Sequence, residues 1–310
     1  MHNPAVVVQV VVTGGTMDTI APQQLFTGTF HVNGATRLYG TIGDPIRQLR
    51  ATQVMARVFE AIGANAVWLP FEGGPQLLPL MLDALAKLRN LGGFTVTIPH
   101  KTAILPLLGR VTKRAQASGS VNLVRRDRDG ALSGDIVDGL GFVRGLEALG
   151  HKVRGASVWL VGVGGAGGAI AAALCEAGVG RLLVSDLDEE RADAALSRLS
   201  RHYPDVPVAS FDTPRIDHPS GVHYAINATP LGLKPGDPLP FDPIHLDPGV
   251  IVAEVIMSPA ETPLLQRAHS HGRRIHHGRH MLDHQVPLYL EWFGIDSRGI
   301  DVVALARSIA

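Results

Sequence analysis

The chain has 310 residues, of which 45% are hydrophobic and 18% are charged. It can therefore bury a sizeable core and is not expected to be disordered. Its length is long for a single core and predicts about two domains. Lys plus Arg number 28, as do Asp plus Glu, so no overall positive field is available for nucleic acid or an anionic membrane. The single cysteine, Cys175, excludes an intramolecular disulfide and fits a reducing compartment.

No segment contains the roughly 18 apolar residues that suggest a transmembrane helix. Residues 1–12 are apolar, but no Lys or Arg precedes them and no cleavage site follows, so no signal peptide is expected. The expected location is the cytoplasm, and no membrane or nucleic acid is expected as a partner.

Short apolar runs alternate with helical windows from residue 37 onward, which is the pattern of an α/β fold. Before them, residues 6–12 have the β-branched density of a strand, and residues 1–36 are interpreted as an N-terminal extension. The predicted elements of the first unit are strand 38–42, helix 52–62, strand 66–70, helix 77–91, strand 93–98, a hairpin of 121–126 with 131–134, and helix 137–150.

A second α/β unit begins near residue 157, and no internal repeat is recognised. Its Pro- and Asp-rich stretch 235–248 is interpreted as a loop. The predicted elements are strand 157–161, helix 166–177, strand 182–185, helix 189–200, strands 224–227 and 250–255, and helices 262–271, 281–293 and 302–310.

A glycine-rich turn directly follows the first strand of this unit, and Gly162, Gly164 and Gly167 satisfy the pattern G-x-G-x-x-G. The first glycine permits a tight turn, the second lets a pyrophosphate approach the backbone, and the third lets helix and strand pack closely. The helix N-terminus offers N–H groups and a positive dipole end to phosphate. The turn therefore predicts a dinucleotide site, with Gly162, Gly164, Gly165, Ala166 and Gly167 binding the cofactor.

An acidic residue, Asp186, ends the next strand. A carboxylate there accepts hydrogen bonds from ribose hydroxyls and repels a 2′-phosphate, and no Lys or Arg lies in 185–188. NAD is therefore favoured over NADP as the cofactor. The alternative for Asp186 and Asp188 is a helix N-cap, and Asp188 is the expected cap of the helix that starts at Glu189.

Two segments of the first unit carry candidate catalytic groups. Lys101 follows a strand end, and Asp138 stands at a predicted helix start. Open α/β sheets bind ligands at the carboxyl ends of their strands. A lysine held by a carboxylate there could move a hydroxyl proton while a hydride leaves for the cofactor. The alternatives are a solvated lysine and a helix N-cap.

From about residue 38 to the C-terminus, the sequence resembles the shikimate/quinate dehydrogenase family. The resemblance rests on segments in the family's order: YGTIGDP (39–45), VTIPHK (96–101), SVN (120–122), DIVDG (135–139), the glycine-rich turn, NATPLG (227–232), PAETPLL (259–265) and MLDHQ (281–285). It implies a two-domain α/β fold with the active site in the cleft between a substrate domain (37–140, completed by helices 280–310) and a Rossmann-type domain (141–279).

The resemblance also implies a reaction and site residues. The family's enzymes reversibly oxidise a ring hydroxyl of a small cyclic carboxylic acid, and aromatic amino acid biosynthesis is the pathway associated with them. Lys101 and Asp138 correspond to the catalytic pair. The residues that would bind substrate are Thr97, Asn122 and Gln285. On the cofactor side are Asn227, Thr229 and Gly278.

Several pocket positions depart from the family's pattern. Leu49 and Ala51 replace two serines that hold the substrate carboxylate in the family, and Met257 replaces a tyrosine. A pocket that loses such hydroxyls binds the former substrate poorly. We therefore expect the chemistry to persist with an altered substrate, and Arg50 to recognise a carboxylate by a bidentate pair.

Six histidines crowd one segment: His269, His271, His276, His277, His280 and His284. Imidazole is a common metal ligand, but no cysteine and only Asp283 accompany the histidines, and the resemblance implies no metal. A solvated or locally hydrogen-bonded histidine surface is expected, and Cys175 is expected to be a small buried apolar residue.

The sequence thus predicts an NAD-dependent oxidoreductase of the shikimate/quinate dehydrogenase type. One alternative is a non-catalytic sensor of NAD or a metabolite on the same fold, and another is a dehydrogenase for a related polyol acid. The expected partner is a small cyclic hydroxy acid, and a homodimer remains open.

Overall fold

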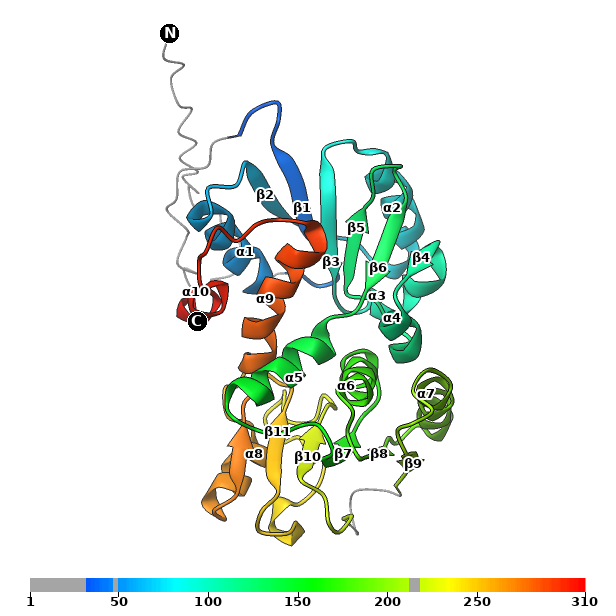
Figure 1. The fold of residues 1–310 in the computed structure, drawn as a ribbon, viewed down its shortest axis with the longest axis vertical. Coiled ribbons are helices and arrows are strands. Elements are labelled where there is room, and N and C mark those ends of the chain that lie inside the picture. The colour runs from blue at the N-terminus through cyan, green and yellow to red at the C-terminus, as the bar shows by residue number, and fades with distance from the viewer. Residues whose placement is uncertain (1–31, 47–49, 212–217, 310) are drawn as a thin grey trace.

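The computed structural model describes residues 32–46, 50–211 and 218–309. The predicted strand at 6–12 and Leu49 lie outside the described residues. Figure 1 shows two sheets, one above the other, with helices α5 (Asp138–Ala148) and α9 (Arg279–Phe293) running between them. No helix in the described part of the chain is long and apolar enough to cross a membrane.

The first sheet is mixed and has the strand order β2-β1-β3-β5-β6-β4. Its strands are β1 (Arg37–Gly43), β2 (Ala66–Glu72), β3 (Leu91–Val96), β4 (Arg110–Val111), β5 (Leu123–Arg126) and β6 (Leu132–Asp135). β1 is parallel to β2 and β3, and the predicted hairpin is the antiparallel pair β5–β6, with Val124 opposite Gly134.

The helices of this unit are α1 (Arg50–Ala61), α2 (Leu78–Lys87), α3 (His100–Ala103), α4 (Lys113–Ser118) and α5, with 3-10 turns at Pro75–Leu77 and Leu105–Leu107. The predicted helix 77–91 was too long. It stops at Lys87 because Leu88 turns extended, with ψ at 111°, and Leu91 enters β3. α3 and α4 are too short to show a helical period, although α4 has an N-cap at Thr112.

The second sheet is entirely parallel, in the order β12-β11-β10-β7-β8-β9, which is the doubly wound order. Its strands are β7 (Ser157–Val161), β8 (Arg181–Ser185), β9 (Val208–Ser210), β10 (Tyr224–Asn227), β11 (Ile251–Glu254) and β12 (Arg274–His276). The helices are α6 (Gly165–Glu176), α7 (Glu189–His202) and α8 (Pro263–Ser270), with a 3-10 turn at Pro243–His245.

α9 and α10 (Val302–Ser308) return to the first sheet, as Figure 1 shows. Close packing of α9 on α5 depends on glycine. A Cβ at Gly141 would lie 2.5 Å from the Met281 carbonyl oxygen, and one at Gly145 would lie 3.0 Å from the His280 Cβ. The predicted domain boundary between residues 140 and 141 falls inside α5 and stays a prediction.

An aromatic cluster fills the space between the first sheet and α9. It consists of Tyr39, Phe59, Trp68, Tyr289 and Phe293. Aromatic rings of this size dominate the apolar area of a core, so this cluster anchors α9 to the sheet.

Candidate active site

The side chains of Lys101 and Asp138 meet at one edge of the first sheet. β3 and β6 are both antiparallel to β5, so they run in the same direction and end at the same edge. α3 follows β3 and α5 follows β6, which brings Lys101 beside Asp138. The Lys101 ammonium donates to Asp138 Oδ2. The side chains are only 17% and 5% exposed, so the pair is largely shielded from water.

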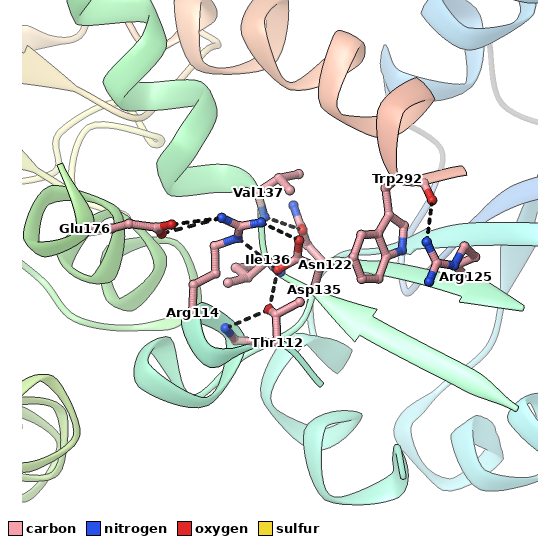
Figure 2. A network of polar contacts seen from close by, with 10 residues as sticks. Thr112, Arg114, Asn122, Arg125, Asp135, Ile136, Val137, Glu176 and Trp292 are labelled. Carbon is pink, nitrogen blue, oxygen red and sulfur yellow. Dashed lines mark hydrogen bonds and ion pairs between the residues drawn. The ribbon is translucent and has the colours of Figure 1, made fainter. Parts of the chain in front are cut away.

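Asn122 holds the second oxygen of this carboxylate. Its Nδ2 donates to Asp138 Oδ1 over 2.8 Å, and its Oδ1 accepts from the backbone N–H of Val137 over 2.9 Å. Figure 2 shows Asn122 and Val137 side by side. Sequence reasoning expected Asn122 to contact substrate, and the structure adds that it orients Asp138.

The other predicted substrate residues are spread over three elements. Gln285 is buried on α9, where its Oε1 accepts a hydrogen bond from Tyr289. Thr97 is half-buried just after β3. Arg50 begins α1 and donates to the carbonyl of Ile309 over 3.3 Å, so its guanidinium lies at the end of the C-terminal helix. The expected role of Arg50 at a carboxylate stays a prediction.

The glycine-rich turn has the geometry that its sequence predicts. Gly162 has φ +93°, which favours glycine, and a Cβ at Gly167 would lie 2.0 Å from the Gly162 carbonyl oxygen. The turn also touches the other half of the site. A Cβ at Gly165 would lie 3.7 Å from the Lys101 Cβ, and Ser120 Oγ donates to the Gly165 carbonyl over 3.2 Å. Gly164 is the N-cap of α6, and Ala166 lies in its first turn.

Asp186 lies at the end of β8 against this turn. Its Oδ2 accepts from the N–H of Val163 over 2.8 Å, and its Oδ1 lies 3.2 Å from the Arg191 guanidinium. Asp188 accepts from the N–H of Arg191 over 3.0 Å, which confirms it as the N-cap of α7. Two carboxylates and one arginine therefore stand where the ribose end of a dinucleotide is expected.

Asn227, one of the other residues predicted on the cofactor side, is held by Glu254, which sequence reasoning missed. Asn227 donates to both Glu254 oxygens, at 3.1 and 3.0 Å, and accepts from the Thr229 hydroxyl at 2.7 Å. Burial raises the pKa of Glu254, and the hydrogen bond from Asn227 lowers it part of the way. A Cβ at Gly278 would lie 2.4 Å from the Ile256 carbonyl oxygen, so only glycine fits there. The sequence did carry a signal for Glu254: it is an acidic residue at the end of a predicted strand, and Asn227 ends the strand predicted before it.

One expectation about the histidine segment is wrong for His276. The ring is 0% exposed and neither nitrogen has a hydrogen-bond partner among the described residues. It packs against Phe142 and His280, with ring centroids 5.5 and 5.1 Å away. Phe142 belongs to α5 and His280 to α9, so residues of both helices cover the ring, whereas His269 and His271 are exposed.

Within the described ranges, no group of three or more His, Cys, Asp or Glu side chains is arranged to hold a metal ion. Cys175 is buried in α6, where burial raises the pKa of its thiol to about 12. The thiol is therefore a packing group, as predicted.

A charged network joins α4 and the end of β6 in the first unit to α6 in the second (Figure 2). Arg114 of α4 donates to both oxygens of Asp135, over 3.0 and 2.8 Å, and to Glu176 of α6 over 3.3 Å. Asp135 is only 1% exposed and also accepts from Thr112 over 2.5 Å. Arg114 thus ties the end of β6 to the helix that follows the glycine-rich turn.

Comparison with known proteins identifies the family of this chain. Residues 41–124 match the model of the shikimate dehydrogenase substrate binding domain. A protein of Rubrobacter xylanophilus named shikimate dehydrogenase (NADP(+)) is 34% identical over 281 residues, which cover 90% of this chain and 97% of the relative. The chain belongs to the shikimate dehydrogenase family.

Solved structures of this family share the fold along most of the chain. Shikimate 5-dehydrogenase from Listeria monocytogenes, in complex with shikimate and NAD, has a TM-score of 0.80 at 29% identity, covering 90% of this chain and 97% of its own. Quinate dehydrogenase from Corynebacterium glutamicum, in complex with NAD, has a TM-score of 0.77 at 32% identity, covering 88% and 98%.

Membership of the shikimate dehydrogenase family confirms three predictions. The fold is α/β with a substrate domain and a Rossmann-type domain, the protein is an oxidoreductase acting on CH–OH, and a nicotinamide dinucleotide is its cofactor. The Rubrobacter relative is named for NADP(+). Family membership therefore does not support the preference for NAD that Asp186 predicts.

Proposed function

We propose that the protein reversibly oxidises a ring hydroxyl of a small cyclic hydroxy acid, with Lys101 and Asp138 handling the hydroxyl proton. One observation carries this proposal. Lys101 is hydrogen-bonded to Asp138, and its side-chain stem lies 3.7 Å from the place where a Cβ on Gly165 of the glycine-rich turn would stand. A proton-transfer group and a phosphate-binding turn thus share one site, which is what hydride transfer to a dinucleotide requires.

Oxidation of a carbinol releases a proton from oxygen and a hydride from carbon. The nicotinamide ring, when bound, accepts the hydride. Lys101 Nζ, which donates to Asp138 Oδ2, would pass the proton of that hydrogen bond to the carboxylate and take the hydroxyl proton of the substrate, so that the pair gains one proton overall. Asn122 fixes Asp138 in turn. In the reverse direction the pair returns the proton to the carbonyl oxygen.

For the cofactor, we propose NAD over NADP. Asp186 and Asp188 place two carboxylates at the ribose end, and a 2′-phosphate would meet their charge. Arg191 is the nearby cation, but it already pairs with both carboxylates, at 3.2 and 3.0 Å.

We propose a substrate that resembles shikimate or quinate. The chain lacks hydroxyl side chains that hold the substrate carboxylate in the family, so the substrate need not be either of these acids. Thr97, Asn122 and Gln285 supply polar groups to ring hydroxyls. Ala51 and Met257 stand where the family has hydroxyl side chains, and a pocket without these groups gains little from the former ligand. Small cyclic acids with fewer or relocated hydroxyls are the class proposed.

The test is a turnover screen of the purified protein with NAD and with NADP. Shikimate, quinate and other cyclic hydroxy acids are offered to the wild type and to Lys101→Ala, and reduced nicotinamide is followed by absorbance. We expect turnover that Lys101→Ala loses. Turnover that survives in Lys101→Ala would rule out the proposed proton path. Tight NAD binding without turnover of any acid would indicate a sensor.

A further inference from the structure

A buried tyrosine lies behind the predicted substrate-binding amide. Gln285 and Tyr289 are four residues apart on α9, so their side chains share one face of the helix. The Tyr289 hydroxyl bonds to Gln285 Oε1, with 2.5 Å between the two oxygens. This contact gives the glutamine a partner within its own helix.

The contact decides which end of the amide is available. A glutamine amide has one acceptor oxygen and two donor hydrogens. Burial and the charge of Asp138 raise the pKa of Tyr289, so the phenol keeps its proton and donates it. Among the described residues, no hydrogen bond from Gln285 Nε2 is found, and Nε2 is not one of the fully buried atoms that lack a partner. The NH2 group is therefore the end left for a ligand.

Neighbouring elements pack tightly against both Gln285 and Tyr289. A Cβ at Gly141 would lie 2.6 Å from Gln285 Cγ, so α5 closes tightly on the stem of the glutamine. The Tyr289 ring stacks on Trp68, with centroids 6.4 Å apart. Trp68 in turn donates from Nε1 to the Thr41 hydroxyl over 2.9 Å. The aromatic cluster thus holds the Tyr289 ring in place, and the Tyr289 hydroxyl in turn orients the Gln285 amide.

We infer that Tyr289 is a positioning residue that turns the Gln285 NH2 group toward the substrate, so that the site accepts a hydroxyl or keto oxygen there and rejects a protonated amine. The identity of the ligand rests on the proposed function. A protonated amine has only donor hydrogens and would face another donor, whereas an oxygen can accept. Discrimination between these groups therefore depends on the orientation of one amide.

The kinetic test uses Tyr289→Phe, which removes the hydroxyl and keeps the ring. For the best hydroxy-acid substrate of the wild type, we expect KM to rise by about tenfold, the value of one hydrogen bond. The kcat and the Kd for NAD should stay within about twofold, because neither proton transfer nor the cofactor depends on this bond. The preference for the hydroxy acid over the analogue carrying an amine at that position should shrink.

Two controls separate positioning from packing. Tyr39→Phe removes a hydroxyl from the same aromatic cluster but away from Gln285, and should leave KM unchanged. In a Gln285→Ala background, Tyr289→Phe should cause no further change, because its effect passes through the glutamine. An equal KM for wild type and Tyr289→Phe, or an additive effect in that background, would overturn the inference.

A structural measurement tests the inference without turnover. Crystal structures of the substrate-free wild type and of Tyr289→Phe should show Gln285 in one rotamer in the first and in more than one in the second. A single unchanged rotamer in the variant would contradict the positioning role. Failure of the wild type to turn over any acid would refute the proposed function, and the rotamer comparison would still decide the role of Tyr289.

Discussion

The ammonium of Lys101 and the carboxylate of Asp138 are 37 residues apart in the chain and are hydrogen-bonded in the fold. Asp138→Asn keeps the shape of the side chain and removes its charge. We expect kcat to fall by roughly 10²- to 10⁴-fold, the usual contribution of a positioned acid–base group. The Kd for NAD, measured by calorimetry, should not change. Asp83→Asn is the matched control, because it breaks the exposed Lys87–Asp83 pair. A kcat for Asp138→Asn close to that of the control would exclude the pair from proton transfer.

The choice between NAD and NADP is expected to depend on Asp186. Asp186→Ser removes the carboxylate that would repel a 2′-phosphate. We expect the ratio of kcat/KM for NAD to that for NADP to fall by about tenfold or more, equivalent to about 1.4 kcal/mol. Asp193→Ser changes an exposed acid on α7 and serves as the control. A ratio that stays the same in Asp186→Ser would show that another group selects the cofactor.

The Arg114 network is expected to contribute unequally to stability. Arg114→Ala leaves the buried carboxylate of Asp135 without its cation, which should lower the free energy of unfolding by about 3 kcal/mol. Glu176→Gln breaks only the exposed limb, where Glu176 is 43% exposed, and should cost at most about 1 kcal/mol. Urea unfolding of both variants measures the difference. Equal losses would mean that the buried pair adds nothing over the surface one.

The buried ring of His276 should make stability depend on pH. Burial lowers its pKa from 6.5 to about 3, so the unfolded chain binds a proton between these values and the folded protein does not. The free energy of unfolding should be highest above pH 6.5. It should fall toward pH 3, with this group contributing a slope of up to about 1.4 kcal/mol per pH unit.

His276→Leu removes the titrating ring and leaves no polar atom unpaired. Urea unfolding between pH 7 and pH 4 should give a shallower slope for this variant than for the wild type. His269→Gln, at an exposed position of the same segment, should keep the wild-type slope. If the slope of His276→Leu matches that of the wild type, the acid sensitivity comes from other groups.

The amino-acid sequence by itself determined the features that depend on neighbouring residues. β7 and β10 have the predicted bounds, the turn at Gly162–Gly167 has the predicted close approach, and Asp188 caps α7. Periodicity, capping and glycine geometry are set within a few residues, so they can be read locally. The segments around Lys101 and Asp138 were recognisable for the same reason.

Only the tertiary structure decided which partner each polar group has. Asn122 holds Asp138, Arg50 turns to the C-terminal helix, and Tyr289 occupies the oxygen of Gln285. His276 is buried because Phe142 of α5 and His280 of α9 pack against its ring. The local sequence of the histidine-rich segment does not indicate this burial. Burial and hydrogen-bond partners come from elements far apart in the chain. They are fixed by strand order and helix packing, which no local pattern of residues encodes.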